Sequence, residues 1–368
     1  MTTPLHMACY GDLRAWFRRR RRAILIAAGA LGAGCVLYYG FTRYSAAALA
    51  RARAVEEEES RLRAETEEER ILHLRRHCDE IQLLADATTL PSLLAHLSER
   101  LFELVNLSEL TRQLMAGKEG PQALTPDEKL NLWQKLKVSS FTRTLCAAWG
   151  MGLVQLFVRV QLNLLGRQLF ISTASFGDLP FSTQHKFLAF GDFLPLHGIA
   201  LLVQDVEEAV TEVMRDISLK KAYSFDELRD LLIQIQAAFE KQQKDWCRYL
   251  LPENDKLPEE DYPVAESSHS RDDDEQLLVA KARDVISSAE FQHTLGAVLD
   301  ALLDTMVQDL LPYYQGQPAV GLPLAKLVPA VSSVGMLLDN RQDSKYVRAV
   351  AELPEVKSFS AMVYGSAA

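Results

Sequence analysis

Apolar side chains recur along most of this chain at the three- and four-residue spacing that places them on one face of an α-helix. Alternation typical of a β-strand is rare, and Gln168–Thr173 is its weak exception. The pattern therefore predicts an all-α fold. The clearest helical faces are formed by Leu93, Leu94, Leu97, Leu101, Leu104 and Val105; by Val203, Val206, Val210, Val213, Met214 and Ile217; by Leu228, Leu231, Leu232, Ile235 and Phe239; and by Leu295, Val298, Leu299, Leu302, Leu303, Met306, Val307 and Leu310.

Two of the predicted helices have clear starts. Thr125 and Ser224 are each followed, three residues later, by Glu128 and Glu227, the arrangement in which the two residues cap the helix reciprocally. Pro91 interrupts the helical pattern that begins at Ile71. Connections rich in glycine and proline are expected at Ala116–Ala123 and Tyr313–Pro323.

A different pattern stands near the N-terminus, where five consecutive arginines precede nineteen uncharged residues, Ala23–Phe41. As a helix, such a segment is about 28 Å long, close to the ~30 Å hydrocarbon core of a bilayer. A cleaved signal peptide is the alternative, but its apolar region is usually only ~7–15 residues long. Tyr38, Tyr39 and Phe41 also suit a lipid–water interface. We therefore favour a transmembrane anchor.

The arginines in front of this anchor are interpreted as part of a targeting and insertion signal. They are Arg18, Arg19, Arg20, Arg21 and Arg22.

The patterns divide the chain into four parts. We predict a basic targeting tail at residues 1–22, a transmembrane helix at 23–41, a charged helical stalk at 42–70, and a single elongated helical bundle at 71–368. A coiled-coil stalk is disfavoured because it has few apolar positions at the required spacing. Residues 252–276 contain three prolines among many acids, and are expected to form a disordered acidic loop.

The apolar segment Leu145–Val158 raises the question of a second membrane span. It holds only fourteen residues before Arg159, short of the ~20 that a transmembrane helix needs. A buried core helix is therefore the favoured interpretation.

Charge is distributed unevenly. The whole chain carries 40 basic and 49 acidic residues, and residues 1–22 hold six of the basic and one of the acidic ones, so the tail is +5 and the remainder is −14. An anionic body argues against nucleic-acid binding, which depends on neutralising phosphates. The basic tail suits anionic lipid head groups or a targeting receptor. Five scattered cysteines without a CxxC pair indicate a reducing compartment.

Sequence signatures of catalysis are absent: there is no Walker loop, no Gly-x-Ser-x-Gly and no His-Glu-x-x-His. His73, His77 and Cys78 could converge on one helix, but a closed zinc site usually needs four ligands. We therefore predict a protein that is not an enzyme and that needs no cofactor or metal.

Two segments carry a resemblance to a known family. Leu132–Arg143 (LWQKLKVSSFTR) and Val158–Gly166 (VRVQLNLLG), with the Arg-Val-Gln-Leu-Asn run as the most specific piece, closely resemble the peroxin 3 family of peroxisomal biogenesis factors. The basic tip with its anchor, Leu322–Pro329 and the stretch from Val356 to Tyr364 add support, so that the resemblance extends over most of the chain.

The resemblance implies a docking receptor on the peroxisomal membrane, with one anchor and a helical cytosolic domain. Such receptors capture the soluble carrier peroxin 19 through an amphipathic helix near its N-terminus. The family's key tryptophan matches Trp133, and its neighbouring groove positions match Lys129, Leu130 and Leu136, with Leu114 on the preceding helix. A membrane-tethered scaffold that recruits organelle-inheritance or autophagy adaptors is the alternative function.

The residue pattern around Trp133 also bears on this predicted binding site. A helix capped at Thr125 presents Leu132, Trp133 and Leu136 on adjoining faces, and tryptophan is enriched at binding hot spots. By pattern alone, Trp133 would be a core residue. The family resemblance instead predicts an exposed anchor for an incoming helix.

Overall fold

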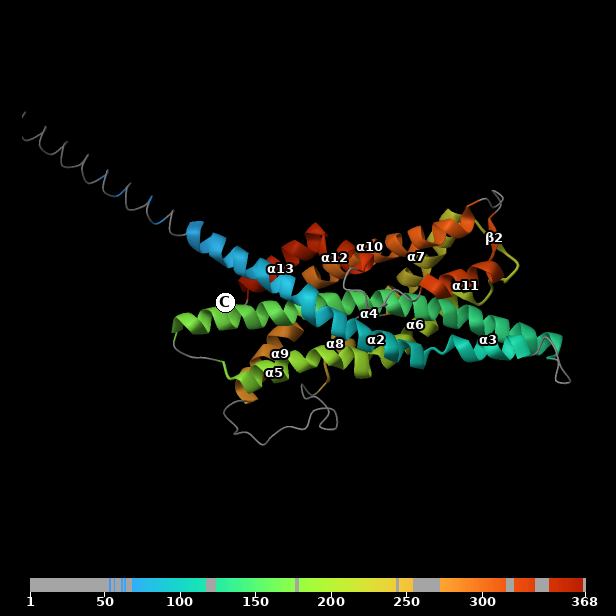
Figure 1. Cartoon of the computed structure of the whole chain (residues 1–368), viewed down its shortest axis with the longest axis horizontal. Helices are drawn as coiled ribbons and strands as arrows, with labels where there is room; N and C mark the ends of the chain where they lie inside the picture. The colour runs from blue at the N-terminus through green and yellow to red at the C-terminus, as the bar shows by residue number, and fades with distance from the viewer. Residues whose placement is uncertain are drawn as a thin grey trace, which may run out of the picture. The chain divides into compact units, whose positions relative to one another are not determined.

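The computed structural model describes residues 53, 56, 61, 63, 68–116, 124–175, 179–242, 245–253, 272–315, 321–334 and 344–366 (Figure 1). The chain forms two compact units, Met1–Leu74 and Arg75–Ala368. The basic tail, the transmembrane helix and most of the stalk lie outside the described residues. The predicted domain boundaries therefore stay predictions.

The arginines assigned to targeting also lie outside the described residues, so their role stays a prediction. This applies to Arg18, Arg19, Arg20, Arg21 and Arg22 alike.

The described part of the second unit is almost entirely helical, which confirms the all-α prediction. Its two short strands pair antiparallel, with Ala222 opposite Pro323 and Tyr223 opposite Leu322. In chain order the elements are η1 (Ala85–Thr89), α2 (Leu90–Leu104), α3 (Leu107–Ala116), α4 (Pro126–Ser175), α5 (Phe181–Ala189), η2 (Phe190–Asp192), η3 (Leu194–Gly198), α6 (Ile199–Met214), β1 (Ala222–Tyr223), α7 (Phe225–Gln242), α8 (Cys247–Leu250), α9 (Asp272–Ile286), α10 (Ala289–Tyr314), β2 (Leu322–Pro323), α11 (Leu324–Val334), α12 (Lys345–Ala351) and α13 (Pro354–Ser366).

Helix α4 is the axis of this unit. It contains 50 residues, which corresponds to about 75 Å at ~1.5 Å per residue. It contacts α2, α3, α6, α9, α10, α11 and α13 (Figure 1). Every residue of Leu145–Val158 is buried, as predicted for a core helix.

Two described segments, Pro126–Phe170 and Phe181–Met214, are long and apolar enough to cross a membrane by length and composition. The apolar window of the first lies wholly inside the fold, and half of the second is buried. Burial of this kind is what a core helix of a helical bundle requires.

Both predicted helix starts are confirmed. The Thr125 amide donates to Glu128 Oε2 at 2.8 Å, and the Glu128 amide donates to Thr125 Oγ1 at 3.2 Å. Ser224 and Glu227 make the same pair of bonds at 2.7 and 3.2 Å. Each helix thus satisfies amides that would otherwise lack a partner in its first turn.

The predicted apolar faces form most of the core. The α7 and α10 faces are buried throughout, and the α6 face is buried or packed against the core. Leu104 is the exception in α2, because it is exposed while Leu101 and Val105 on either side are buried. It sits in the last turn of the helix, where the packed face ends.

Three local predictions were wrong. Pro91 does not interrupt the helix: the chain continues from residues 75–84 through the π-turn η1, and the Leu90 amide donates to the Ala85 carbonyl five residues earlier. A π-turn widens the helix, which relieves the clash that a proline ring makes with the preceding turn. Gln168–Thr173 is helical and belongs to α4.

The third correction concerns the acidic loop. The predicted loop extends to residue 276, but α9 begins at Asp272. Acidic residues in a first turn interact favourably with the helix dipole, and Leu278, Val279, Ala282 and Ile286 bury one face of α9 against the bundle.

Candidate partner-binding face

Helix α3 lies beside the N-terminal part of α4 (Figure 1). Asn106 caps it, because its Oδ1 accepts hydrogen bonds from the Ser108 amide at 3.1 Å and the Glu109 amide at 3.3 Å. Leu107 and Leu114 are buried in the contact between the helices. The Asn106-Leu107-Ser108 sequence therefore has a structural role at a helix start.

The structure places the predicted site residues on these two helices, but at different depths. Leu130 is 54% exposed, whereas Leu114 and Leu136 retain only 6% and 7% exposure. Lys129, Leu132 and Trp133 are half-buried, and both apolar side chains pack against the core. Trp133 is therefore neither a fully buried core residue nor a free-standing anchor: part of its surface faces solvent and part is held by the fold.

One exposed apolar residue of α3 is not among the predicted site residues. Met115 is 64% exposed at the end of α3, next to the buried Leu114. The sequence does hold a sign of this exposure, because Met115 is an apolar residue that lies outside the buried side of a short helix. Leu110, Met115, Leu130, Leu132 and Trp133 are exposed or half-buried apolar residues of these two packed helices, and we refer to them together as the α3–α4 face.

Lys137 holds in place the part of α4 that carries Trp133. It lies one helical turn after Trp133, is almost fully buried, and donates from Nζ to the carbonyl oxygens of Met214 at 3.0 Å and Ile217 at 2.9 Å. Burial lowers the pKa of its ammonium group. The bonds satisfy carbonyls at the end of α6, so Trp133 is held on a segment clamped between α3 and α6.

The Arg-Val-Gln-Leu-Asn run of α4 has a different role. Buried Arg159 pairs with Asp86 Oδ1 of η1 at 2.7 Å, and its Nη1 donates to the Gln155 carbonyl at 3.1 Å. Gln161 Nε2 donates to the Phe187 carbonyl of α5 at 2.7 Å. These side chains fasten α4 to two other elements, which explains the residue types by folding rather than by contact with a partner.

Asn163 completes the run. Its Oδ1 accepts a hydrogen bond from Gln82 Nε2 at 2.9 Å and a weaker one from the Cys78 thiol at 3.8 Å. His77, one residue before Cys78, bonds through Nδ1 to the Tyr364 hydroxyl at 2.7 Å. The cysteine and histidine considered as metal ligands thus make packing contacts. In the described part of the chain, no group of three or more His, Cys, Asp or Glu side chains could hold a metal ion.

Comparison with known proteins identifies the family. The family model described as Peroxin-3 matches residues 118–176 and 173–366, which include α4 and the elements up to α13. The chain belongs to the Peroxin-3 family. It is similar to Peroxisome biogenesis protein 3-1 of Arabidopsis thaliana, at 30% identity over 96% of this chain and 98% of that protein. It is also similar to Peroxisomal biogenesis factor 3 of Mus musculus, at 28% identity over 78% of this chain and 82% of that protein.

Peroxin-3 proteins are biogenesis factors, so membership implies a role in peroxisome biogenesis. That role involves partner proteins and the peroxisomal membrane. The relationship with the Arabidopsis thaliana proteins covers almost the whole chain, so it also includes the predicted anchor segment that lies outside the described residues.

Proposed function

We propose that this Peroxin-3 protein is a non-enzymatic docking receptor of the peroxisomal membrane. A single N-terminal span, Ala23–Phe41, anchors it, and the helical bundle faces the cytosol. There it captures peroxin 19, the carrier of newly made membrane proteins, so that these proteins can be inserted. The family relationship and the anchor-like sequence support this proposal.

One structural observation carries the choice of site: half-buried Trp133 and exposed Leu130 lie three residues apart on α4, and exposed Met115 lies on α3, which packs against α4. An amphipathic helix binds by laying its apolar side into an apolar surface formed by neighbouring helices. The α3–α4 face offers such a surface, and the buried contacts of Leu114 and Leu136 keep it rigid. A rigid receptor loses little conformational entropy on binding.

Replacing the tryptophan tests the site. Trp133→Ala should weaken binding of the amphipathic peroxin 19 helix by roughly 2 kcal/mol, or about 30-fold in Kd, because an aromatic side chain at the centre of an interface is a typical hot spot. Fluorescence anisotropy with a labelled carrier peptide measures the change. Ile233→Ala is the matched control, since Ile233 is an exposed apolar residue of α7 and should leave the affinity unchanged.

An unchanged affinity in Trp133→Ala, with helicity preserved by circular dichroism, would contradict the site assignment. Failure of the unmodified protein to bind the carrier peptide would contradict the receptor function itself. Recovery of inheritance or autophagy adaptors without the carrier, in a pull-down with the intact protein, would instead favour the scaffold alternative.

A further inference from the structure

A second concave surface lies elsewhere in the same helical unit. Two cavities, of about 370 and 230 Å³, adjoin at Trp246 and Gln292, which line both. The larger has a mixed lining, with apolar side chains of α4 and α10 beside polar Glu240 and Gln292. The smaller is lined mainly by polar side chains from α8, α9, α10 and the residues next to these helices. We call the two together the Trp246 groove, formed by Trp149, Glu240, Asp245, Trp246, Cys247, Arg283, Ile286, Ser287, Gln292, Leu295, Gly296 and Leu299.

The antiparallel pair α7 and α10 creates the larger cavity. The two helices are joined towards one end, where Arg229 pairs with Asp304 at 2.7 Å and the Phe225 ring packs edge-on against Tyr314. Towards the other end, Glu240 of α7 and Gly296 of α10 line the opening. A Cβ atom at Gly296 would meet nothing within 4 Å, so the glycine leaves free space over α10.

The floor of the groove is aromatic and rigid. Trp246 stacks on Trp149 with ring centroids 5.0 Å apart, and Phe239 packs edge-on against Trp149 at 4.9 Å. Tyr249, further along the same segment, donates from its hydroxyl to Asp205 Oδ2 at 2.6 Å. Trp149 and Trp246 are only 2% and 8% exposed, so they form a fixed apolar base beneath the opening rather than a wide exposed surface.

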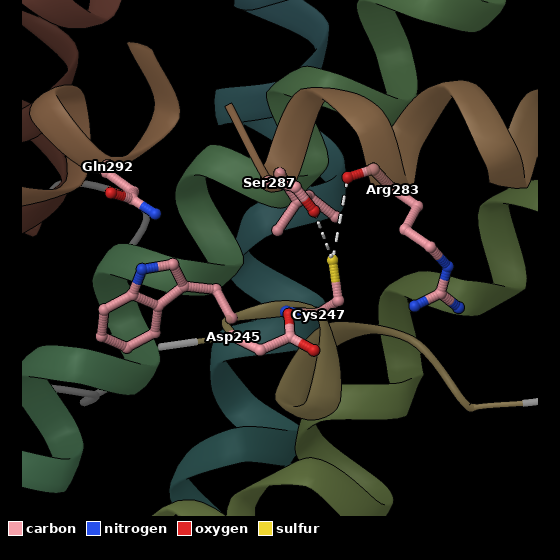
Figure 2. Close-up of a pocket in the computed structure, with 7 residues that line it drawn as sticks. Asp245, Cys247, Arg283, Ser287 and Gln292 are labelled. Carbon is pink, nitrogen blue, oxygen red and sulfur yellow. Dashed lines mark hydrogen bonds between the residues drawn. The ribbon is translucent and has the colours of Figure 1, made fainter. Parts of the chain in front are cut away.

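The smaller cavity is polar, as Figure 2 shows. The Cys247 thiol points towards Ser287, with Sγ and Oγ 3.5 Å apart, and towards the Arg283 carbonyl at 3.8 Å. Burial raises the pKa of this thiol, so it acts as a neutral hydrogen-bonding group rather than a nucleophile. The polar lining suits the backbone and polar side chains of a bound segment.

Charge favours a basic occupant. Two carboxylates, Glu240 and Asp245, and one guanidinium, Arg283, line the groove. Gln236 Nε2 donates to Glu240 Oε1 at 2.9 Å and so orients that carboxylate. The chain beyond residue 22 has a net charge of −14, from 34 basic and 48 acidic residues, which attracts cationic segments at longer range.

We propose that the Trp246 groove docks a protein segment in which a bulky apolar side chain stands beside a lysine or arginine. The apolar side chain enters the space above Gly296, against Trp149 and Trp246, and the cation lies near Glu240. The groove is separate from the α3–α4 face, because Trp149 follows Trp133 by sixteen residues on one helix, a rise of about 24 Å.

The test uses the full chain in phosphatidylcholine nanodiscs. The probe is a short peptide of leucine and lysine with one benzophenone-bearing phenylalanine, and its partner has glutamate in place of each lysine. Photocrosslinks of the lysine peptide should map by mass spectrometry to the groove segments of α7, α8, α9 and α10. Gly296→Leu, which fills the free space, should weaken binding about tenfold, and Glu240→Lys by about two- to fivefold.

Two controls keep the result specific. Gly296→Ala adds a small side chain where there is room, and should bind nearly as the unmodified protein does. Trp133→Ala should leave crosslinking in the groove unchanged, so the groove and the carrier site can fail independently. Equal binding of the glutamate peptide, crosslinks confined to the α3–α4 face, or full affinity in Gly296→Leu would each overturn the proposal. Binding of an uncharged fatty acid that displaces the peptide would assign the groove to a lipid chain instead.

Discussion

At the scale of single residues, the long helix α4 is notable for polar side chains inside an apolar core. Lys137, Arg159, Gln161 and Asn163 are all buried, and each makes hydrogen bonds to a different neighbouring segment. An apolar face can slide by a helical turn at modest cost, but a buried polar group left without its partner costs about 1–3 kcal/mol. These residues therefore fix the register of the bundle around α4.

The Arg159–Asp86 pair gives the sharpest prediction at this scale. Asp86→Asn would leave a buried guanidinium without its counter-charge, and should lower the free energy of unfolding by about 2–4 kcal/mol, since breaking such a pair from one side is costly. Thermal unfolding of the detergent-solubilised chain, followed by circular dichroism, measures the loss.

Asp79→Asn is the matched control, because Asp79 is exposed and precedes Asp86 by two helical turns. It should change the stability little. If replacing both partners by apolar residues, Asp86→Leu with Arg159→Met, were as destabilising as Asp86→Asn alone, the explanation by an unpaired buried charge would be wrong.

At the scale of elements, the sequence patterns predict correctly those helix starts and apolar faces that depend on interactions between residues close together in the chain. The capping pairs at Thr125 and Ser224 and the apolar faces of α7 and α10 form as expected, because hydrogen bonds within four residues and a 3.6-residue period specify them. The π-turns at η1 and η3 were not predicted. Each accommodates a proline inside a continuous helix, Pro91 after η1 and Pro195 within η3, and this depends on packing against other elements.

The candidate site was predictable only in part. The family resemblance points to Trp133 and its neighbours, but burial of Leu114 and Leu136 and exposure of Met115 follow from how α3 lies on α4. A one-residue difference along a short helix decides that Met115 faces solvent while Leu114 is buried. The Trp246 groove had no sequence signal, because its walls come from helices far apart in the chain.

Alanine substitutions at two glycines, Gly198 and Gly296, test how closely η3 approaches α8. At Gly198, the last residue of η3, an added Cβ would lie 2.0 Å from the Tyr249 carbonyl oxygen, a clash with backbone that cannot move aside. Gly198→Ala should therefore destabilise the fold by roughly 1–3 kcal/mol. Gly296→Ala has open space, and should be neutral or stabilising by about 0.4–1 kcal/mol, since alanine favours a helix over glycine. Equal melting temperatures for the two variants would contradict the close approach of η3 and α8.

At the scale of the whole molecule, the contrast between a +5 tail and a −14 remainder, on the two sides of one apolar segment, bears on orientation in the membrane. The positive-inside rule taken alone would keep Arg18–Arg22 in the cytosol and move the bundle across the membrane. The cysteines favour the opposite: Cys78, Cys146 and Cys247 are all free and buried, as expected of a domain in a reducing compartment.

The proposed orientation is tested by protease protection on intact peroxisomes from cells that express the chain with a different tag at each end. The C-terminal tag should disappear on protease treatment, whereas the N-terminal tag should survive until detergent is added. The reverse pattern would place the bundle inside the organelle, where a cytosolic carrier could not reach Trp133. Protection of neither tag would argue against a membrane span at Ala23–Phe41 with one end inside. The orientation therefore decides whether the α3–α4 face and the Trp246 groove can both serve cytosolic partners.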